Sequence, residues 1–290
     1  MTGLRAVGRM FGQSRRKRAP ADPWLAFCRG AVQDVRGVLE RLPGRNEREP
    51  IVGMGAGGDE TTAVDAAAEA AIVARLHRLH ESDKLDFHLV SEELGERDFG
   101  FSPERRVLLD PIDGSMNAKR NIPFFSLSVA VAEGARMEDV VFGYVYDFGS
   151  GEEWRATRGG GAWLNGERLG VLRPKDQIEV LAVEATVAGA VADKAVAFAG
   201  FAKRLRIMGS LALSLCQLAA GRVDAVCSLK EARPVDIAAA QLLLREVGLP
   251  IGFADAGPFD AAPLDSAARS PVAAAGTQEL CDRLAHIVAT

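Results

Sequence analysis

The chain has 290 residues, of which 48% are hydrophobic and 26% are charged, and its formal net charge at pH 7 is −4. This length and hydrophobic content are enough to bury one large core, or two halves that pack closely together. The negative net charge argues against nucleic acid as the main partner, because phosphate backbones bind basic surfaces.

Residues 1–20 are basic and contain no acidic side chain. The segment lacks the apolar core of 7–15 residues that a secretory signal needs. We expect a disordered basic tail, followed by a single domain over residues 21–290. A membrane-surface or nucleic-acid-binding arm and an Arg-rich transit peptide are the alternatives that this composition leaves open.

Two features of the whole chain favour a cytoplasmic location. Its sequence contains no uninterrupted run of about 18 apolar residues, so no membrane span is predicted. Its four cysteines are widely scattered and form no CxxC pair. That spacing implies neither a zinc site nor a disulfide framework, and it fits a reducing compartment.

Apolar periodicity predicts an amphipathic helix over residues 24–42 that ends near Pro43 and Gly44. A glycine-rich loop then leads to a second helix at about residues 62–80. Short runs rich in β-branched and aromatic residues follow, and we expect them to form strands. The runs at residues 126–132 and 140–146 are candidates for an antiparallel hairpin, and the runs at residues 153–156 and 162–164 are expected to continue its sheet. The expected strands are residues 87–90, 107–109, 126–132, 140–146, 153–156 and 162–164.

Strands and helices alternate in the second half of the chain. Strands are expected at residues 179–183, 205–207 and 224–227, and helices at residues 190–201, 210–220 and 236–247. This alternation predicts a layered α/β structure with its sheets covered by helices. A soft boundary near Arg173 and Pro174 divides the domain into halves of about residues 21–173 and 174–290.

The segment from Asp110 to Ser115, with the sequence DPIDGS, is the most informative in the chain. The apolar run before it is expected to be a buried strand that ends at Asp110, because Pro111 cannot continue an ordinary ladder. Asp110 and Asp113 would repel each other at this turn unless a cation lay between them. Oxygen ligands without nearby His or Cys favour Mg²⁺ or Mn²⁺ over Zn²⁺.

Three further segments place carboxylates at the ends of predicted elements. Glu92 and Glu93 end one apolar run, Asp236 lies where a proline-bearing loop enters an apolar helix, and Asp59 and Asp65 flank the start of an Ala-rich helix. Each has an ordinary alternative explanation, as a helix cap or as solvated charge. One shared site accounts for all four segments at once.

These four segments resemble the motifs of the inositol monophosphatase family, which are Mg²⁺-dependent, Li⁺-sensitive phosphomonoesterases. The similarity runs in order from about residue 59 to residue 248. Flanking stretches such as IPFFS at residues 122–126 and GGGAWLNG at residues 159–166 resemble the archaeal-type members that act on inositol monophosphate and fructose 1,6-bisphosphate. The resemblance implies a five-layered αβαβα sandwich of the sugar phosphatase type, in which helices cover mixed sheets and the metal site lies between the two halves.

The resemblance also implies a ligand set for two or three Mg²⁺ ions, with Mn²⁺ as a substitute. Glu92, Asp110 and the backbone carbonyl of Ile112 would bind the first ion. Asp110, Asp113 and Asp236 would bind the second. The turn is expected to aim Asp113 back toward Asp110 and to leave the Ile112 carbonyl free.

Catalytic and phosphate-binding roles follow from the same resemblance. Ser115, where the family more often has threonine, would hydrogen-bond the attacking water with Asp65 as its acceptor, and Glu92 would complete the catalytic set. The backbone N–H groups of Gly114 and Ser115 would hold the phosphate at a helix start. Glu93 is expected to lie behind these residues, and Asp59 and Thr62 to cap or brace the same helix start.

Two departures from the family pattern concern the substrate. Ser228 stands where the inositol-selective animal enzymes carry a glutamate, and Val235 replaces the tryptophan before the last metal-binding aspartate. A cation at Lys230 would suit a second phosphate or a sugar acid better than a neutral polyol ring. A solvated loop position is the alternative for Lys230.

We therefore predict a Mg²⁺-dependent phosphomonoesterase that hydrolyses inositol 1-phosphate or a related sugar or polyol phosphate. Fructose 1,6-bisphosphate and 3′-phosphoadenosine nucleotides are the alternative substrates. A non-catalytic regulatory binding protein of the same fold is the alternative from another class, but such a protein would be expected to lose a metal carboxylate. The expected partner is a small phosphate monoester, with neither nucleic acid nor membrane, and homodimers are common in the family.

Overall fold

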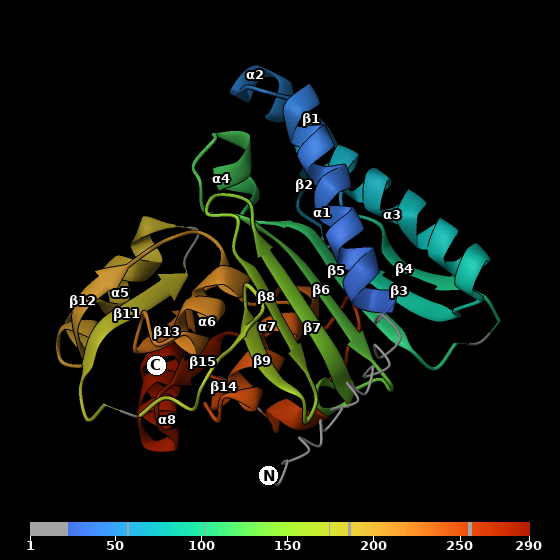
Figure 1. The fold of residues 1–290 in the computed structure, drawn as a ribbon. Coiled ribbons are helices and arrows are strands. Elements are labelled where there is room, and N and C mark those ends of the chain that lie inside the picture. Colours follow the sequence, from blue (N-terminus) through green and yellow to red (C-terminus); the bar gives the residue numbers. More distant parts are fainter. Residues whose placement is uncertain (1–22, 57, 102, 174, 185–186, 255–256) are drawn as a thin grey trace, which may run out of the picture.

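Two mixed β-sheets and three layers of helices alternate in the structure, a computed structural model of the chain (Figure 1). It describes residues 23–290 except residues 57, 102, 174, 185–186 and 255–256. The basic tail predicted for residues 1–20 lies outside the described residues. The observed order of layers is helix, sheet, helix, sheet, helix, which confirms the predicted αβαβα architecture with helix-covered mixed sheets.

The larger sheet has eight strands in the order β10-β9-β8-β7-β6-β5-β3-β4, and only the β3–β5 pair among them is parallel. Its strands are β3 (Phe87–Ser91), β4 (Gly95–Phe99), β5 (Arg106–Asp113), β6 (Ser126–Ala132), β7 (Val140–Asp147), β8 (Glu153–Thr157), β9 (Gly161–Leu164) and β10 (Glu167–Arg168). Strand β6 is buried along its whole length, because helices cover both faces of the sheet at that point.

The sequence predicted that this strand would end at Asp110, but strand β5 continues to Asp113. Its pairing with β6 shifts between Asp110 and Asp113, so that the strand carries a bulge at the proline. A bulge tolerates proline because the extra residue makes no ladder hydrogen bond. Asp110 and Asp113 therefore lie on the sheet itself rather than on a free turn.

The first outer layer consists of α1 (Pro23–Arg41) and α3 (Ala63–Asp83), which cover one face of the large sheet (Figure 1). Helix α1 is amphipathic, and its buried positions recur every three or four residues, as at Phe27, Ala31 and Val35. Short elements near these helices are α2 (Arg45–Arg48), β1 (Ile51–Met54), β2 (Glu60–Thr62) and α4 (Ser115–Lys119).

The middle layer consists of α6 (Leu211–Ala219) and α7 (Pro234–Glu246), which share one hydrophobic core with both sheets. Alternation along β5 explains this arrangement, because Leu108 faces the middle layer while Val107 and Leu109 face α1 and α3. Helix α7 is apolar on almost every side, as expected for a helix between two sheets. The two predicted halves thus pack on a continuous core.

The smaller sheet has the strand order β12-β11-β13-β15-β14, and helices cover its outer face. The sequence predicted no element after residue 247, whereas the structure has two further strands and a final helix there, which complete this sheet and its cover. The elements are β11 (Ile178–Glu184), α5 (Ala188–Ala199), β12 (Ala202–Arg206), β13 (Ala225–Ser228), β14 (Ile251–Phe253), β15 (Val272–Ala275) and α8 (Gln278–Ala289); two single 3₁₀ turns lie at Met137–Asp139 and Phe259–Ala261.

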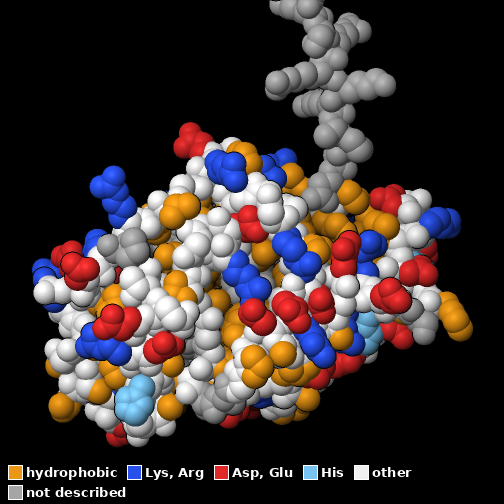
Figure 2. Space-filling view, turned by 90° about the horizontal axis from the view of Figure 1, so that it is seen from below, with side chains coloured by type: hydrophobic (Ala, Val, Ile, Leu, Met, Phe, Trp, Pro, Cys, Tyr) orange, Lys and Arg blue, Asp and Glu red, His pale blue; other side chains and the backbone are white. Residues whose placement is uncertain are grey.

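No helix in the described part of the chain has the length and apolar character needed to cross a membrane. The face in Figure 2 shows Lys and Arg side chains interspersed with Asp and Glu side chains, with hydrophobic atoms scattered among them. This face therefore presents charge of both signs rather than one broad basic surface.

Gly143 on β7 allows α7 to lie directly against the large sheet, and replacing it tests this packing. A Cβ atom at Gly143 would lie 2.5 Å from the carbonyl oxygen of Ala239 on α7. We expect Gly143→Ala to cost about 1–3 kcal/mol by overpacking, which lowers the melting temperature by roughly 2–12 °C. Gly252→Ala on β14 is the control, because a Cβ atom there would meet no other atom within 4 Å. Equal melting temperatures for the two variants would contradict this account of the layer contact.

Candidate active site

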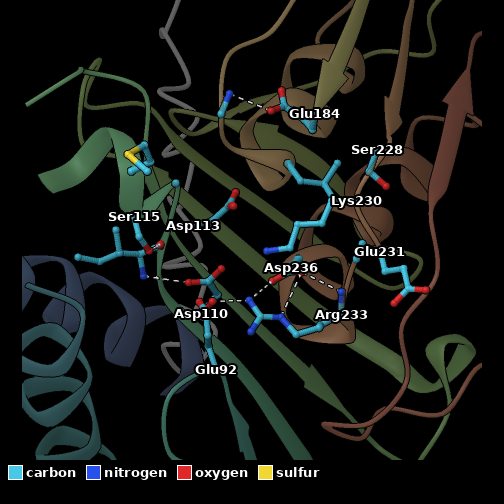
Figure 3. Close-up of a pocket in the computed structure, with 16 residues that line it drawn as sticks. Glu92, Asp110, Asp113, Ser115, Glu184, Ser228, Lys230, Glu231, Arg233 and Asp236 are labelled. Carbon is cyan, nitrogen blue, oxygen red and sulfur yellow. Dashed lines mark hydrogen bonds and ion pairs between the residues drawn. The ribbon is translucent and has the colours of Figure 1, made fainter. Parts of the chain in front are cut away.

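A cavity of about 230 Å³ lies between the two sheets, where the bulge of β5, the first turn of α7 and the end of β13 meet (Figure 3). Nine of the ten residues predicted for the site line it. They are Glu92, Asp110, Ile112, Asp113, Gly114, Ser115, Ser228, Lys230 and Asp236. The tenth, Asp65, is buried on the first turn of α3. Residues that are far apart in the sequence thus form one site.

Asp110 is the most deeply buried carboxylate in this cavity, with 1% of its surface exposed. One carboxylate oxygen accepts a hydrogen bond from the backbone N–H of Ile112 at 2.9 Å, which fixes the bulge. Burial, followed by the charges of Glu92, Asp113 and Asp236, raises the pKa of Asp110 well above its usual value. The site therefore holds more negative charge than its own side chains can stabilise.

Asp113 is held by the start of α6. Its Oδ2 atom accepts hydrogen bonds from the Ser210 hydroxyl and, at 2.8 Å, from the backbone N–H of Ala212. Burial is the main cause that raises its pKa to about 7, and these two hydrogen bonds oppose the shift. Ser210 is also the N-cap of α6, so the cap of one element positions a carboxylate of another.

Glu92 and Asp236 are joined by the guanidinium group of Arg233, the residue before α7. Arg233 Nη2 donates to Glu92 and, at 3.2 Å, to Oδ1 of Asp236. The backbone N–H of Arg233 donates to Oδ2 of Asp236 at 2.8 Å. Figure 3 shows the guanidinium between the two carboxylates. This cation supplies part of the neutralising charge that the carboxylates need.

The donor atoms in the cavity suit a hard divalent cation. The four carboxylates predicted to bind metal are among six acidic side chains that line the cavity, together with Glu184 and Glu231, and oxygen donors of this kind bind Mg²⁺ or Mn²⁺. Among the residues that the structure describes, no three acidic, His or Cys side chains converge closely enough to form a ready-made cage. The Arg233 contacts hold Glu92 and Asp236 on the guanidinium instead.

Ser115 and Asp65 lie behind the carboxylates. Ser115 donates its hydroxyl hydrogen to the Ile112 carbonyl at 3.1 Å. The sequence predicted that this carbonyl would be free, but one of its lone pairs is used here and only the second is available for a metal ion. Thr62 donates to Asp65 Oδ2 at 2.5 Å, whereas no described residue donates to buried Oδ1. Burial raises the pKa of Asp65, and the hydrogen bond from Thr62 opposes that shift.

The opposite side of the cavity comes from the smaller sheet. Glu184 and Ser228 end the parallel strands β11 and β13 and are partners in the register. The Ser228 hydroxyl oxygen accepts a hydrogen bond from the backbone N–H of Val272 at 2.9 Å, so this side chain also braces β15. The Lys230 side chain is 46% exposed, and its Nζ lies 3.9 Å from Asp59.

The structure places the three residues that were expected to support the site in three different positions. Glu93 accepts a hydrogen bond from Thr61, and burial is the main cause that raises its pKa to about 7. Thr62 is the N-cap residue of α3. Asp59 lies before β2 and is exposed, and its carboxylate lies 3.9 Å from both Lys230 and Arg233, so it faces the cavity cations rather than capping α3.

Three residues of the site were assigned no role from the sequence. Arg233 is three residues from Asp236, and its charge next to a predicted metal ligand was the available signal. Glu184 directly follows the predicted strand at residues 179–183, as Asp110 directly follows the predicted strand at residues 107–109, and that shared pattern could have identified it. Ser210 shows only as a helix cap in the sequence, because its contact with Asp113 spans 97 positions.

Comparisons with known proteins show which family the chain resembles over its length. The model of the inositol monophosphatase family matches residues 25–289. A fructose-1,6-bisphosphatase/inositol-1-monophosphatase of Methanothermobacter thermautotrophicus is 33% identical over 271 residues, which cover 90% of this chain and 95% of that protein. The Nus factor SuhB of Escherichia coli is 34% identical over 197 residues, which cover 66% of this chain and 70% of that protein.

A solved structure described as an inositol monophosphatase-fructose 1,6 bisphosphatase superposes with a TM-score of 0.76. It is 27% identical, and the match covers 91% of this chain and 99% of that one. An inositol monophosphatase from Thermotoga maritima, at 24% identity and a TM-score of 0.73, shows the same fold. The similarity therefore extends over both sheets.

The raised carboxyl pKa values predict how the stability of the metal-free protein depends on pH. Burial raises the pKa of Glu184 from 4.5 to about 7, and it also raises the pKa values of Glu93 and Asp113 to about 7. The folded state then binds more protons than the unfolded state between about pH 4 and pH 7, so stability falls as the pH rises through this range.

Thermal unfolding in chelator from pH 5 to pH 8.5 measures this dependence. Glu184→Gln should reduce the slope, because an amide does not titrate. A melting temperature that rises over this range would contradict the assignment.

Proposed function

The chain belongs to the inositol monophosphatase family, whose members are phosphatases of sugar or polyol phosphates. We propose that the cavity between its two sheets is the active site of such a phosphatase. Glu92, Asp110 and the Ile112 carbonyl would hold one Mg²⁺, and Asp110, Asp113 and Asp236 a second. When bound, Mg²⁺ or Mn²⁺ neutralises charge on the phosphoryl oxygens and lowers the pKa of a coordinated water. The carboxylates from β5, α7 and the β3–β4 connection that line this cavity carry the proposal.

Ser115 and Asp65 are suited to holding the attacking water. The Ser115 hydroxyl can accept a hydrogen from water while its own hydrogen points to an acceptor, and Asp65 contributes to the same network. Glu92 and Ser115 both line the cavity, and the charge of Glu92 acts on Asp65. Orientation of this kind lowers the barrier because it removes the entropy cost of aligning the reactants.

Gly114 and Ser115 line the cavity at the start of α4 and are suited to contact the phosphate. Gly114 adopts a left-handed backbone with φ of 101°, which an L-residue with a side chain rarely adopts. A side chain there would also meet the Gly209 carbonyl at 2.9 Å. The glycine thus allows the backbone to turn sharply between Asp113 and Ser115.

The sugar or polyol part of the substrate would extend toward Ser228, Lys230 and Glu184. A carboxylate and a hydroxyl at paired strand ends can bind hydroxyl groups, and an ammonium group can bind an anion. Inositol 1-phosphate and fructose 1,6-bisphosphate both fit this description. Relatives that are named for both activities, such as the Methanothermobacter thermautotrophicus protein, support both of these substrates.

Asp113→Asn tests the proposed centre. The amide keeps an oxygen that can accept from Ser210 and Ala212, but it removes the charge that a metal ion requires. We expect kcat/KM to fall by about 100-fold or more, with a metal-free melting temperature equal to or above that of the wild type. Phosphate release from inositol 1-phosphate measures the first effect.

Asp147→Asn provides a matched control for this variant. Asp147 is also buried and accepts hydrogen bonds from Gly149 and Ser150 at 2.7 Å, but it does not line the cavity. Its replacement should leave the rate within about threefold of the wild type. A full rate for Asp113→Asn at saturating Mg²⁺ would show that this cavity is not the active site.

Lys230→Ala distinguishes the two candidate substrates. If Lys230 contacts a remote phosphate, its loss should lower kcat/KM for fructose 1,6-bisphosphate by roughly 10- to 150-fold. The effect on inositol 1-phosphate should be far smaller, since that substrate has no second phosphate. Small, equal effects on both substrates would place Lys230 outside the substrate site.

A further inference from the structure

Arg233 is the buried cation of the cavity, and only 6% of the residue's surface is exposed. Its guanidinium contacts Glu92 from the β3–β4 connection and Asp236 from α7, which are one carboxylate from each of the two proposed metal positions. Its Nη1 atom is buried and donates no hydrogen bond to any described residue, although Asp59 lies 3.9 Å away. A single side chain therefore spans both positions.

These contacts occupy oxygen atoms of two of the proposed metal ligands. Nη2 binds Glu92 and Oδ1 of Asp236, and Nε lies 3.5 Å from Oδ2 of Asp236. A carboxylate oxygen that accepts a hydrogen bond from the guanidinium does not at the same time point toward a metal ion elsewhere in the cavity. The absence of a preformed cage among the described residues agrees with this arrangement.

The charge balance explains why the arginine occupies this place. Burial alone would lower the pKa of Arg233, but the charges of Asp236, Glu92 and Asp110 raise it above its usual range. Four carboxylates crowd one cavity, and the repulsion between them costs stability unless a cation reduces it. Arg233 supplies that cation from the chain itself.

We propose that Arg233 is a resident counter-ion that competes with the metal for Glu92 and Asp236, so that metal binding must displace its guanidinium. This inference rests on the proposed metal ligands and adds a residue that sets their affinity for metal. The competition lowers metal affinity and stabilises the metal-free fold. The displaced guanidinium remains beside the cavity, where its unused Nη1 donor can face an anionic ligand.

A purely structural role for Arg233 makes a different prediction. The backbone N–H of Arg233 holds Asp236 at 2.8 Å, and this bond does not depend on the side chain. Truncating the side chain therefore preserves the start of α7 and removes only the guanidinium contacts. If these contacts merely hold the ligands in place for metal, truncation should weaken metal binding rather than strengthen it.

Mn²⁺ binding to metal-free protein, measured by the electron paramagnetic resonance of free Mn²⁺, separates the two roles without using activity. Arg233→Ala should lower the Kd for Mn²⁺ by about 10-fold or more, because two charge-assisted hydrogen bonds no longer compete. Lys230→Ala is the matched control: it removes a positive charge from the same cavity but has no contact with Glu92 or Asp236, so its Kd should change by less than about threefold.

Thermal unfolding supplies the second readout. In chelator, Arg233→Ala should melt below Lys230→Ala, and saturating Mn²⁺ should remove this difference. Arg233→Lys keeps the charge but lacks the planar fork of donors that holds both carboxylates, so its Kd should lie between those of wild type and Arg233→Ala. This variant serves as the test if the alanine variant does not fold.

An unchanged or raised Kd in Arg233→Ala, or in Arg233→Lys where that variant is used, overturns the competition. Wild-type protein that binds no Mn²⁺, or binds it equally well as Asp113→Asn, instead contradicts the proposed metal centre itself. The two failures are therefore distinguishable.

Discussion

Repulsion among four carboxylates in one buried cavity is the constraint on which the rest of the site depends. Asp110 is almost fully buried, and its neighbours raise its pKa well above the usual value. Such a cluster is stable only when protonated or when cations neutralise it. In the metal-free protein Arg233 meets part of this need, and the hydroxyl and N–H donors of α6 meet another part at Asp113. The proposed catalytic chemistry uses the same excess of negative charge, which attracts divalent metal.

The layered fold is what brings these charges together. Helix α7 lies between the two sheets, so its first turn delivers Asp236 to the bulge of β5. Gly143 lets the helix approach the large sheet closely, and Ser210 at the start of α6 fixes Asp113. The parallel strands β11 and β13 end on the opposite side and contribute Glu184 and Ser228. Ligands commonly bind at the carboxyl ends of parallel strands, and here those ends face the carboxylates proposed to bind metal.

Much of this arrangement could be predicted from the sequence. The DPIDGS segment carried enough chemistry to predict a cation site, and strand and helix alternation predicted the layers. The bulge at Pro111 could not be predicted, because it depends on how β5 pairs with β6. The contact of Arg233 with Glu92 spans 141 positions, so local patterns do not reveal it. Strands β14 and β15 are short, and their place in the smaller sheet is set by partners elsewhere in the chain.

The central claim is that these carboxylates bind divalent metal in the cavity, and anomalous diffraction from crystals grown with Mn²⁺ tests it most directly. The account predicts anomalous peaks within coordination distance of Asp110, Asp113, Glu92 and Asp236, with the Arg233 guanidinium moved away from Glu92. A well-ordered cavity without an anomalous peak, in which Arg233 still binds Glu92 and Asp236 at saturating Mn²⁺, would contradict it.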